Sequence, residues 1–557
     1  MPGFLGVERI SQGPWQALER AIQRLLIHSG FDDVRLVGGA GDGGGDVVAN
    51  LKQQTWVIQS KYKSGGQVVG AKVVEEVAPA IGKYGAEVAV VATNAAISKD
   101  AIERAKRLEM DIGTRILLWN GKFLLERFRK LQEYANRRNE PRPYQEQAIE
   151  AINSMILYGG DRGLLLMATG LGKTRVAAGV IEQWIKDRPG NEILVIAPSL
   201  SLVPQLEASL WPYLPKDVAT HVLVGSEKPS FQGGVTVATV QSMLNRGAED
   251  RERFGLVVVD EAHHAPADGY RQLLSELSPK FVFGMTATPW RGDERRLEDI
   301  FGDPTYTVSI VEGMQLGYLA AVDYRMMVDT IDWDWVRENL NSSLTIRELN
   351  RRLFIPERDD ALVSKIRQHL DEMTDPRAVV FCRSIDHAES IARRLQAEGF
   401  AVHAIHSRLD RFETTKILRD FRAGDVPIIV TVDMLNEGID IPDVNLIAFL
   451  RVTHSRRIFV QQLGRGLRLS PGKAEVRVLD FVSDVRRIAA ARGLNREGES
   501  LAANPPEEQI LRYPDGQIVK FEGDEASSFF DEYLGDIAEL EEGSDDSQLQ
   551  FPTNEQF

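Results

Sequence analysis

Cysteine, long apolar runs and a secretion signal are scarce or missing in this sequence. Its 557 residues include one cysteine, Cys382. A single cysteine excludes an internal disulfide and a cysteine-based zinc site, and it fits a reducing, intracellular compartment. No apolar run approaches the roughly 20 residues of a membrane span, and the N-terminus MPGFLGVERISQGPW lacks the basic and apolar regions of a signal peptide. We therefore expect a cytoplasmic protein without a membrane partner.

A surplus of positive charge is also missing, which at first argues against a nucleic-acid partner. The formal net charge is −15. However, residues 521–557 contain twelve Asp and Glu and no Lys or Arg, so the other 520 residues carry only −3. A nearly neutral body with local basic patches is compatible with DNA binding. The acidic tail has two interpretations: a disordered solubilising segment, or a segment that docks on a basic groove in competition with DNA.

A glycine-rich turn in LLLMATGLGKT (Leu164–Thr174) is the strongest chemical signal in the sequence. It follows a short apolar run and precedes RVAAGV, which gives the order of strand, turn and helix that cradles phosphates. Backbone N–H groups of such a turn and the positive end of the helix bind phosphate oxygens. Lys173 is expected to reach the β- and γ-phosphates of ATP, and the Thr174 hydroxyl to bind Mg²⁺. The candidate nucleotide-binding residues of this turn are Thr169, Gly170, Gly172, Lys173 and Thr174.

Two acidic residues end a later apolar run, in LVVVDEAHH (Leu256–His264). Apolar runs alternate with helical patterns here, which predicts a parallel sheet with ligands at the carboxyl ends of its strands. Asp260 is expected to bind the Mg²⁺ of the nucleotide, and Glu261 to orient and deprotonate the attacking water. Acid pairs after strands also cap helices, but the preceding P-loop favours the catalytic interpretation. Ahead of the P-loop, Gln145 offers a donor and an acceptor that suit the adenine edge.

The first 130 residues contain a second candidate site. The pattern predicts strands at Val47–Asn50 and Trp56–Lys61, joined by a short turn. Side chains two residues apart on a strand share a face, so Gln59 and Lys61 point the same way, and the hairpin brings Asp46 beside them. A carboxylate, an amide oxygen and a lysine can hold Mg²⁺ and position water against a phosphodiester. A solvated hairpin edge would show the same spacing.

A family resemblance supports the nuclease interpretation. The runs GDGGGDVV, WVIQSKYK and AVVATNAAISKDAIERA resemble the Mrr-type restriction endonuclease domain of the PD-(D/E)xK superfamily, over about Trp15–Leu125. The resemblance implies that Asp46, Gln59 and Lys61 form the active site, with Mg²⁺ held by Asp46 and Gln59. It adds Glu19, on the first predicted helix, as a further metal ligand. Because Gln59 replaces the acid of the general superfamily pattern, Mg²⁺ is expected to bind more weakly there.

A second resemblance covers Pro141–Phe481. The motifs RPYQ, MATGLGKT, VIAPS, VATVQSM, DEAH, GMTATP, AVVFCRS, TVDMLNEGIDIP and QQLGRGLR resemble, in this order, those of superfamily 2 helicases and of the motor subunits of type I and type III restriction enzymes. It implies two RecA-like lobes that close on one ATP, with further nucleotide contacts from Gly438 and Asp440. Arg465 and Arg468, one helical turn apart, are then expected to stabilise the γ-phosphoryl transition state as arginine fingers.

The sequence thus predicts an α/β chain with a restriction-endonuclease-like domain followed by two tandem RecA-like parallel-sheet domains. The expected divisions are an endonuclease-like domain at 1–128, a helical linker at 129–140, a first lobe at 141–322, a helical connector at 323–359, a second lobe at 360–490, and an extension with the acidic tail at 491–557.

The main functional hypothesis is an ATP-dependent DNA translocase coupled to a Mg²⁺-dependent endonuclease, acting in restriction or antiviral defence. ATP and Mg²⁺ are the expected cofactors. Duplex DNA is the expected partner, with single strands as the alternative, and a specificity or defence protein is a further candidate partner because the sequence contains no evident target-recognition domain. Two alternatives remain open: a repair helicase-nuclease that acts on branched or damaged DNA, and a nucleic-acid-sensing ATPase whose N-terminal domain binds without cutting.

Overall fold

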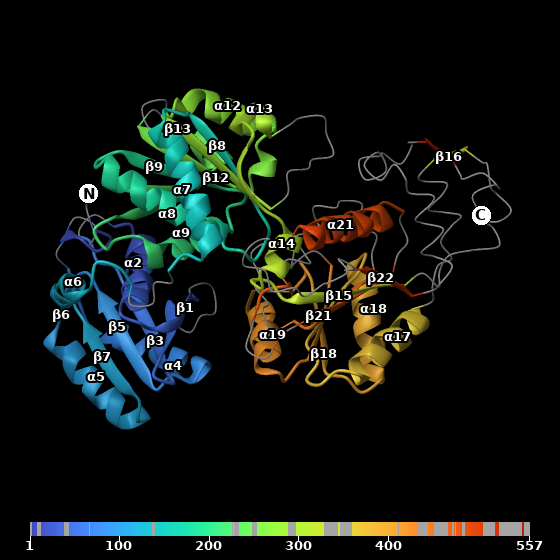
Figure 1. Cartoon of the computed structure of the whole chain (residues 1–557). Helices are drawn as coiled ribbons and strands as arrows, with labels where there is room; N and C mark the ends of the chain where they lie inside the picture. The colour runs from blue at the N-terminus through green and yellow to red at the C-terminus, as the bar shows by residue number, and fades with distance from the viewer. Residues whose placement is uncertain are drawn as a thin grey trace. The chain divides into compact units, whose positions relative to one another are not determined.

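The structure is a computed structural model, and it describes most of the chain in two compact units (Figure 1). The first unit comprises Met1–Leu165, Gly172–Thr286 and Arg296–Tyr306, and the second comprises Leu166–Leu171, Ala287–Arg295 and Thr307–Phe557. The described residues are 3–7, 13–37, 44–65, 67–135, 140–225, 227, 233–247, 253–287, 297–327, 343–345, 359–409, 411–432, 444–450, 466–469, 473, 475–481, 485–504, 519–522 and 548–550.

The N-terminal domain is built on a five-stranded sheet of order β1-β2-β3-β5-β7. The first three strands pair antiparallel, and β3, β5 and β7 pair parallel. Its elements are α2 (Trp15–His28), β1 (Asp32–Leu36), β2 (Val47–Leu51), β3 (Gln54–Lys61), β4 (Val68–Val69), α3 (Ala71–Glu75), α4 (Ala78–Tyr84), β5 (Val88–Thr93), β6 (Ala96–Ile97), α5 (Lys99–Ile112), β7 (Arg115–Trp119) and α6 (Gly121–Lys130).

Both faces of this sheet are covered, because alternate strand residues point to opposite sides. Val47 and Ile58 pack under α2 and α6, whereas Val48 and Val57 pack under α3, α4 and α5. This alternation places Gln59 and Lys61 on the same face as Val57, which is the face that α3 and α4 cover.

The first lobe contains a seven-stranded sheet of order β10-β11-β9-β12-β13-β8-β14. The neighbours among β9 to β13 pair parallel. Its elements are α7 (Pro143–Leu157), β8 (Arg162–Met167), α8 (Lys173–Asp187), β9 (Glu192–Ala197), α9 (Val203–Leu210), η1 (Trp211–Tyr213), β10 (Thr220–Leu223), β11 (Val235–Thr239), α10 (Val240–Leu244), β12 (Phe254–Asp260), η2 (Ala262–His264), α12 (Asp268–Leu277), β13 (Phe281–Thr286), α13 (Glu298–Phe301) and β14 (Pro304–Val308).

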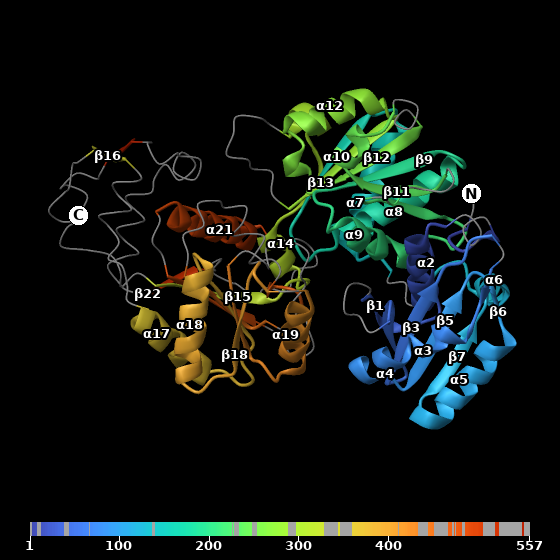
Figure 2. The same cartoon turned by 180° about the vertical axis from the view of Figure 1, so that it is seen from behind.

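Helix α2 joins the N-terminal domain to the first lobe within the first unit. It lies between the N-terminal sheet and the helices α9 and η1 (Figure 1, Figure 2). The guanidinium of Arg20 is 4% exposed and binds two carboxylates of the first lobe, with Nε 2.8 Å from Glu207 Oε2 and Nη1 2.6 Å from Glu227 Oε2. One turn later, Arg24 donates to the carbonyls of Val218 (2.8 Å) and Pro215 (3.0 Å). Buried charges therefore connect the two domains.

Further contacts extend this interface. Glu207 also accepts a hydrogen bond of 2.6 Å from the Thr220 hydroxyl, which itself accepts from the Trp211 indole. Lys216 Nζ donates to the carbonyl of Leu131, just beyond α6, at 2.6 Å. Burial, with the neighbouring Arg24 charge, lowers the pKa of His28 to about 3, so this interface histidine is neutral at physiological pH.

The second lobe contains a seven-stranded sheet of order β18-β19-β17-β20-β21-β15-β22. Helices α17 and α18 pack beside each other on this sheet, and both contribute to its core (Figure 2). The elements of the second unit are α14 (Ile310–Gln315), β15 (Ala321–Met327), β16 (Ser343–Thr345), α17 (Asp359–Asp371), β17 (Ala378–Phe381), α18 (Ile385–Ala397), β18 (Val402–Ile405), α19 (Arg411–Ala423), β19 (Ile428–Thr431), β20 (Leu446–Phe449), β21 (Glu475–Phe481), α21 (Val485–Ala503), β22 (Val519–Glu522) and β23 (Gln548–Gln550).

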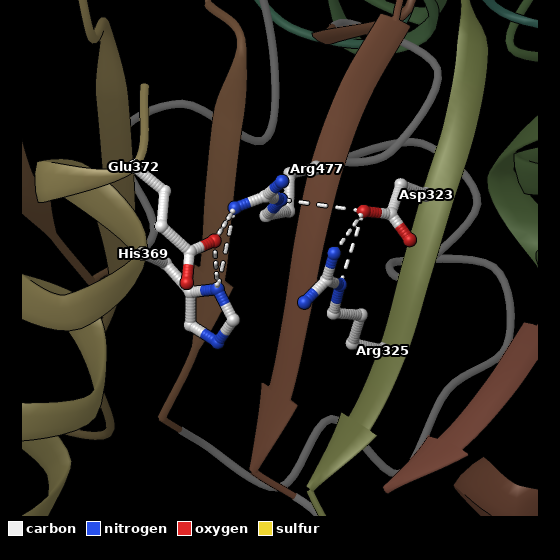
Figure 3. Close-up of polar contacts among 5 residues, drawn as sticks. All are labelled: Asp323, Arg325, His369, Glu372 and Arg477. Carbon is white, nitrogen blue, oxygen red and sulfur yellow. Dashed lines mark hydrogen bonds and ion pairs between the residues drawn. The ribbon is translucent and has the colours of Figure 1, made fainter.

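A polar network fixes strand β15 in this sheet (Figure 3). Asp323 on β15 lies opposite Arg477 on β21, and its Oδ2 accepts from Arg477 Nε (3.3 Å) and from Arg325 Nη2 (2.9 Å). Arg477 Nη1 also donates to Glu372 Oε2 at 2.7 Å and to His369 Nδ1 at 3.4 Å. The hydrogen bond from Arg477 lowers the pKa of Glu372. One arginine thus connects two strands to the C-terminal end of α17.

The structure corrects two expectations about the segments between domains. The predicted helical linker at 129–140 is helical only to Lys130, where α6 ends, and its other described residues form no helix. The predicted helical connector at 323–359 begins as strand β15, and Ser343–Thr345 also form a strand. The first lobe therefore ends before Ala321, because Ala321–Met327 completes the sheet of the second lobe. No helix in the described part of the chain is long and apolar enough to cross a membrane.

Replacement of Arg20 by alanine tests the connection through α2. The substitution leaves Glu207 and Glu227 buried near each other without their cation, which is expected to destabilise the first unit by about 3–5 kcal/mol. The measurement is urea denaturation of the full chain. Arg104→Ala, which removes an exposed ion pair with Glu75, is the matched control and should cost less than about 1 kcal/mol. Equal midpoints for the two variants would contradict the account.

Candidate active sites

The P-loop has the backbone that the sequence predicts. Gly170 and Gly172 have φ of +92° and +89°, the left-handed region that glycine adopts without strain. Gly172 is the N-cap of α8, and no side chain of the described residues caps this helix end. The hydroxyl of Thr169 is buried and has no hydrogen-bond partner in the described part of the chain. Lys173 and Thr174 form the first turn of α8, so a helix N-terminus is available to an anion.

Gln145 lies directly against this turn. Its amide is buried, and a Cβ added to Gly172 would lie 2.6 Å from Gln145 Nε2. Its Oε1 accepts a hydrogen bond of 3.0 Å from the Arg142 backbone N–H, which positions the amide at the start of α7. An alanine at position 172 would therefore have to displace the end of the Gln145 side chain, in addition to the strain of its φ.

The acid pair lies at the carboxyl end of β12. Asp260 is the last residue of this strand, and Glu261 follows with φ of +47°, a strained conformation for a residue with a side chain. His263 is buried, and its Nδ1 lies 2.9 Å from Thr286 Oγ1 and 3.3 Å from Glu261 Oε2. Thr286 ends β13, which pairs parallel with β12. His263 therefore connects the predicted water-activating acid to the TAT motif on the adjacent strand.

The second-lobe candidates are only partly described. Arg465, Gly438 and Asp440 lie outside the described residues. Arg468 forms an isolated antiparallel bridge with Leu319, so it leaves the helix on which the sequence placed it one turn from Arg465.

The nuclease candidates line one open pocket of about 720 Å³ in the N-terminal domain. Asp46 precedes β2, and its Oδ2 accepts from the Ser60 backbone N–H at 2.6 Å. Gln59 is buried, whereas Lys61 is partly exposed. The structure thus brings Asp46, Gln59 and Lys61 together, and Glu19 of α2 lines the same pocket. The remaining lining residues are Trp15, Gly44, Ser60, Tyr62, Glu76 and Pro79.

Glu76 is the pocket residue that the sequence did not single out. Its Oε2 accepts from Lys61 Nζ at 2.8 Å and from Gln59 Nε2 at 3.2 Å. The hydrogen bond from Lys61 lowers the pKa of Glu76. Glu76 lies in the bend between α3 and α4, next to Glu75, and no local spacing distinguishes the two acids. Only the packing of α3 on the sheet selects Glu76.

Whether this pocket suits Mg²⁺ depends on its oxygen atoms. No three His, Cys, Asp or Glu side chains converge at metal-binding spacing in the described part of the chain. However, Gln59 Oε1 is buried without a hydrogen-bond partner in the described part of the chain, and Gln59 and Asp46 line the same pocket. An unsatisfied buried carbonyl oxygen is costly, and Mg²⁺ accepts one or two protein oxygens while it keeps several waters. The donor set therefore fits Mg²⁺ held by few protein ligands.

Three known protein families match successive regions of the chain. Residues 10–128 match the family described as restriction endonuclease, residues 138–291 the family of type III restriction enzyme res subunits, and residues 361–470 the helicase conserved C-terminal domain. The chain joins an Mrr-type restriction endonuclease domain to a superfamily 2 helicase. The order of the three matches is the order that the sequence motifs predict.

Individual relatives are distant. The EcoAI endonuclease subunit, a type I restriction enzyme of Escherichia coli, is 29% identical over 395 residues, which are 63% of this chain and 47% of that protein. The DNA 3'-5' translocase XPB2 of Sulfurisphaera tokodaii is 26% identical over 364 residues, 59% of this chain and 79% of that protein.

A solved structure shares the fold. The ATP-dependent type ISP restriction-modification enzyme LlaBIII bound to DNA superposes with a TM-score of 0.54 at 17% identity, over 90% of this chain and 40% of that one. The predicted α/β fold class is confirmed. The chain spans about half the length of several proteins that it matches.

Gly172→Ala tests the approach of Gln145 to the P-loop. The methyl group would overlap Gln145 Nε2 at a φ that costs an alanine roughly 1–2 kcal/mol, so ATP hydrolysis should fall at least ~10-fold. The measurement is steady-state phosphate release in the presence of DNA. Gly190→Ala is the matched control, because Gly190 has φ of +94° but open space around a Cβ. Similar losses in both variants would show that close approach at position 172 does not matter.

Proposed function

We propose that this protein is an ATP-driven DNA translocase whose N-terminal domain cuts DNA with Mg²⁺, and that it acts in the restriction of foreign DNA. The observation that carries the proposal is the position of α2. Glu19 of this helix lines the nuclease pocket, and the next residue, Arg20, is buried between Glu207 and Glu227 of the first lobe. The proposed cutting site therefore belongs to the same compact unit as Lys173, Asp260 and Glu261.

The proposed ATP site uses the residues that the motifs indicate. The N-terminus of α8 and Lys173 would hold the phosphates, while Thr174 and Asp260 would hold the Mg²⁺ that accompanies ATP. Glu261 would orient the attacking water, and its contact with His263 would keep that carboxylate in place. Gly170, Thr169 and Gln145 would complete the turn on the first lobe. On the second lobe, the expected contributors are Gly438, Asp440, Arg465 and Arg468.

The proposed nuclease site uses a different set of groups. Asp46 and Gln59 Oε1 would hold a divalent cation, with Glu19 as a further ligand, and the bound metal would supply Lewis-acid activation of the phosphodiester. Lys61, held on the pocket wall by Glu76, would neutralise charge that develops on the phosphate. This arrangement positions two oxygen ligands and one cation on a single sheet edge.

We prefer restriction to repair because restriction enzymes are among the proteins that this chain resembles. The first lobe matches the type III res subunit family, and relatives include type I and type ISP restriction enzymes. The names of XPB2, a DNA 3'-5' translocase, and of LlaBIII bound to DNA support DNA as the partner. A specificity or defence protein is a further partner in this proposal.

Cleavage of plasmid DNA tests both halves of the proposal. With Mg²⁺ and ATP the wild type should cut, Lys61→Ala should lose cleavage by about 10²-fold or more while retaining DNA-stimulated ATPase activity, and Lys173→Ala should lose both activities. Gel assays of DNA and phosphate release provide the two readouts.

Two lysines provide matched controls. Lys63→Ala changes a neighbouring residue that does not line the pocket, and Lys186→Ala changes the far end of α8, where Lys186 pairs with Glu182. Both should behave as the wild type. A wild type that cuts no DNA, methylated, unmethylated or branched, would remove the nuclease assignment. Cleavage by Lys173→Ala at the wild-type rate would show that cutting does not need the motor, and preference for branched DNA would support repair.

A further inference from the structure

The nuclease pocket contains the carboxylate of Glu76, which has no direct part in the proposed cleavage chemistry. Glu76 Oε2 accepts hydrogen bonds from both Gln59 Nε2 (3.2 Å) and Lys61 Nζ (2.8 Å). It therefore contacts the two residues of the QxK motif that face the pocket.

The contact with Gln59 determines which end of the amide points toward Glu76. An ionised carboxylate can only accept hydrogen bonds, whereas an amide has a donor end and an acceptor end. Glu76 therefore selects the orientation in which Nε2 points toward it. The opposite end, Gln59 Oε1, is left buried and without a hydrogen-bond partner in the described part of the chain. A buried carbonyl oxygen held in this way is ready for a cation.

The position of Glu76 is well fixed. It lies between α3 and α4, and the flanking Val74 and Val77 are fully buried under the sheet. Gly44, with φ of +85°, lies so close that a Cβ added to it would be 2.0 Å from the Glu76 carbonyl oxygen. The loop that leads to Asp46 therefore packs against the backbone that carries Glu76. This packing connects the loop before Asp46 to the backbone at Glu76.

We propose that Glu76 is the positioning residue of the nuclease site, which turns Gln59 Oε1 toward a divalent cation beside Asp46 and holds the Lys61 ammonium at the pocket wall. The inference rests on the proposed nuclease function. It explains how the Gln59 amide can replace the acid of the general superfamily pattern. In this chain an acid, Glu76, contacts the amide and orients it.

Metal binding tests this inference without cleavage. The probe is Mn²⁺, titrated by calorimetry into the nucleotide-free full chain, and the binding that Asp46→Ala removes defines the nuclease site. Glu76→Gln can present either amide end to Gln59, so it should weaken this binding by ~10-fold or more, within the range for residues that orient metal ligands. Glu76→Asp keeps an acceptor and should lose less. Glu75→Gln, next to it on α3 but outside the pocket, should bind as the wild type.

A double-mutant cycle tests whether Glu76 acts through Gln59. In a Gln59→Leu background there is no amide to orient, so adding Glu76→Gln should change Mn²⁺ affinity by less than about 2-fold. Unchanged affinity in the Glu76→Gln single variant, or an equal loss in both backgrounds, would overturn the inference while leaving the nuclease assignment intact. If Asp46→Ala removes no Mn²⁺ binding and the wild type does not cut, the nuclease function itself fails.

Discussion

The arrangement of the first unit depends on the ion pairs that the buried Arg20 guanidinium forms with two carboxylates. A buried arginine is costly unless its charge and its donors find partners, and here the two carboxylates that pair with it, Glu207 and Glu227, come from the first lobe. Because Arg20 lies on α2 beside Glu19, the helix that forms one wall of the nuclease pocket is also the helix that the motor lobe holds. One helix therefore connects the proposed nuclease pocket to the motor lobe.

The two candidate sites share a construction. In each, a glycine with positive φ lies near a glutamine amide: a Cβ added to Gly172 would lie 2.6 Å from Gln145 Nε2, and one added to Gly44 would lie 3.6 Å from Gln59 Nε2. The amides are then oriented by other partners, the Arg142 N–H in the first case and Glu76 in the second. Both amides are neutral, so in the proposed sites they would contact a phosphate or a metal ion without adding charge.

Local patterns predicted the parts of the structure that local rules control. The hairpin that brings Asp46 to Gln59 and the glycines of the P-loop follow from strand periodicity and turn chemistry, and both lie as expected. The prediction of a helical connector from residue 323 was wrong, because its start belongs to strand β15. That strand is completed by β21, which lies about 150 residues later in the sequence. Glu76 was missed for the same reason, since only the packing of α3 separates it from Glu75.

The central claim is that the nuclease and the first motor lobe move as one body. Cys382 is buried, so cysteines introduced at the exposed Met110 on α5 and Tyr158 after α7 can carry spin labels selectively. The distance between the labels, measured by pulsed electron paramagnetic resonance with and without a non-hydrolysable ATP analogue and DNA, should give one narrow distribution that does not change. A broad distribution, or one that shifts when nucleotide binds, would contradict the account.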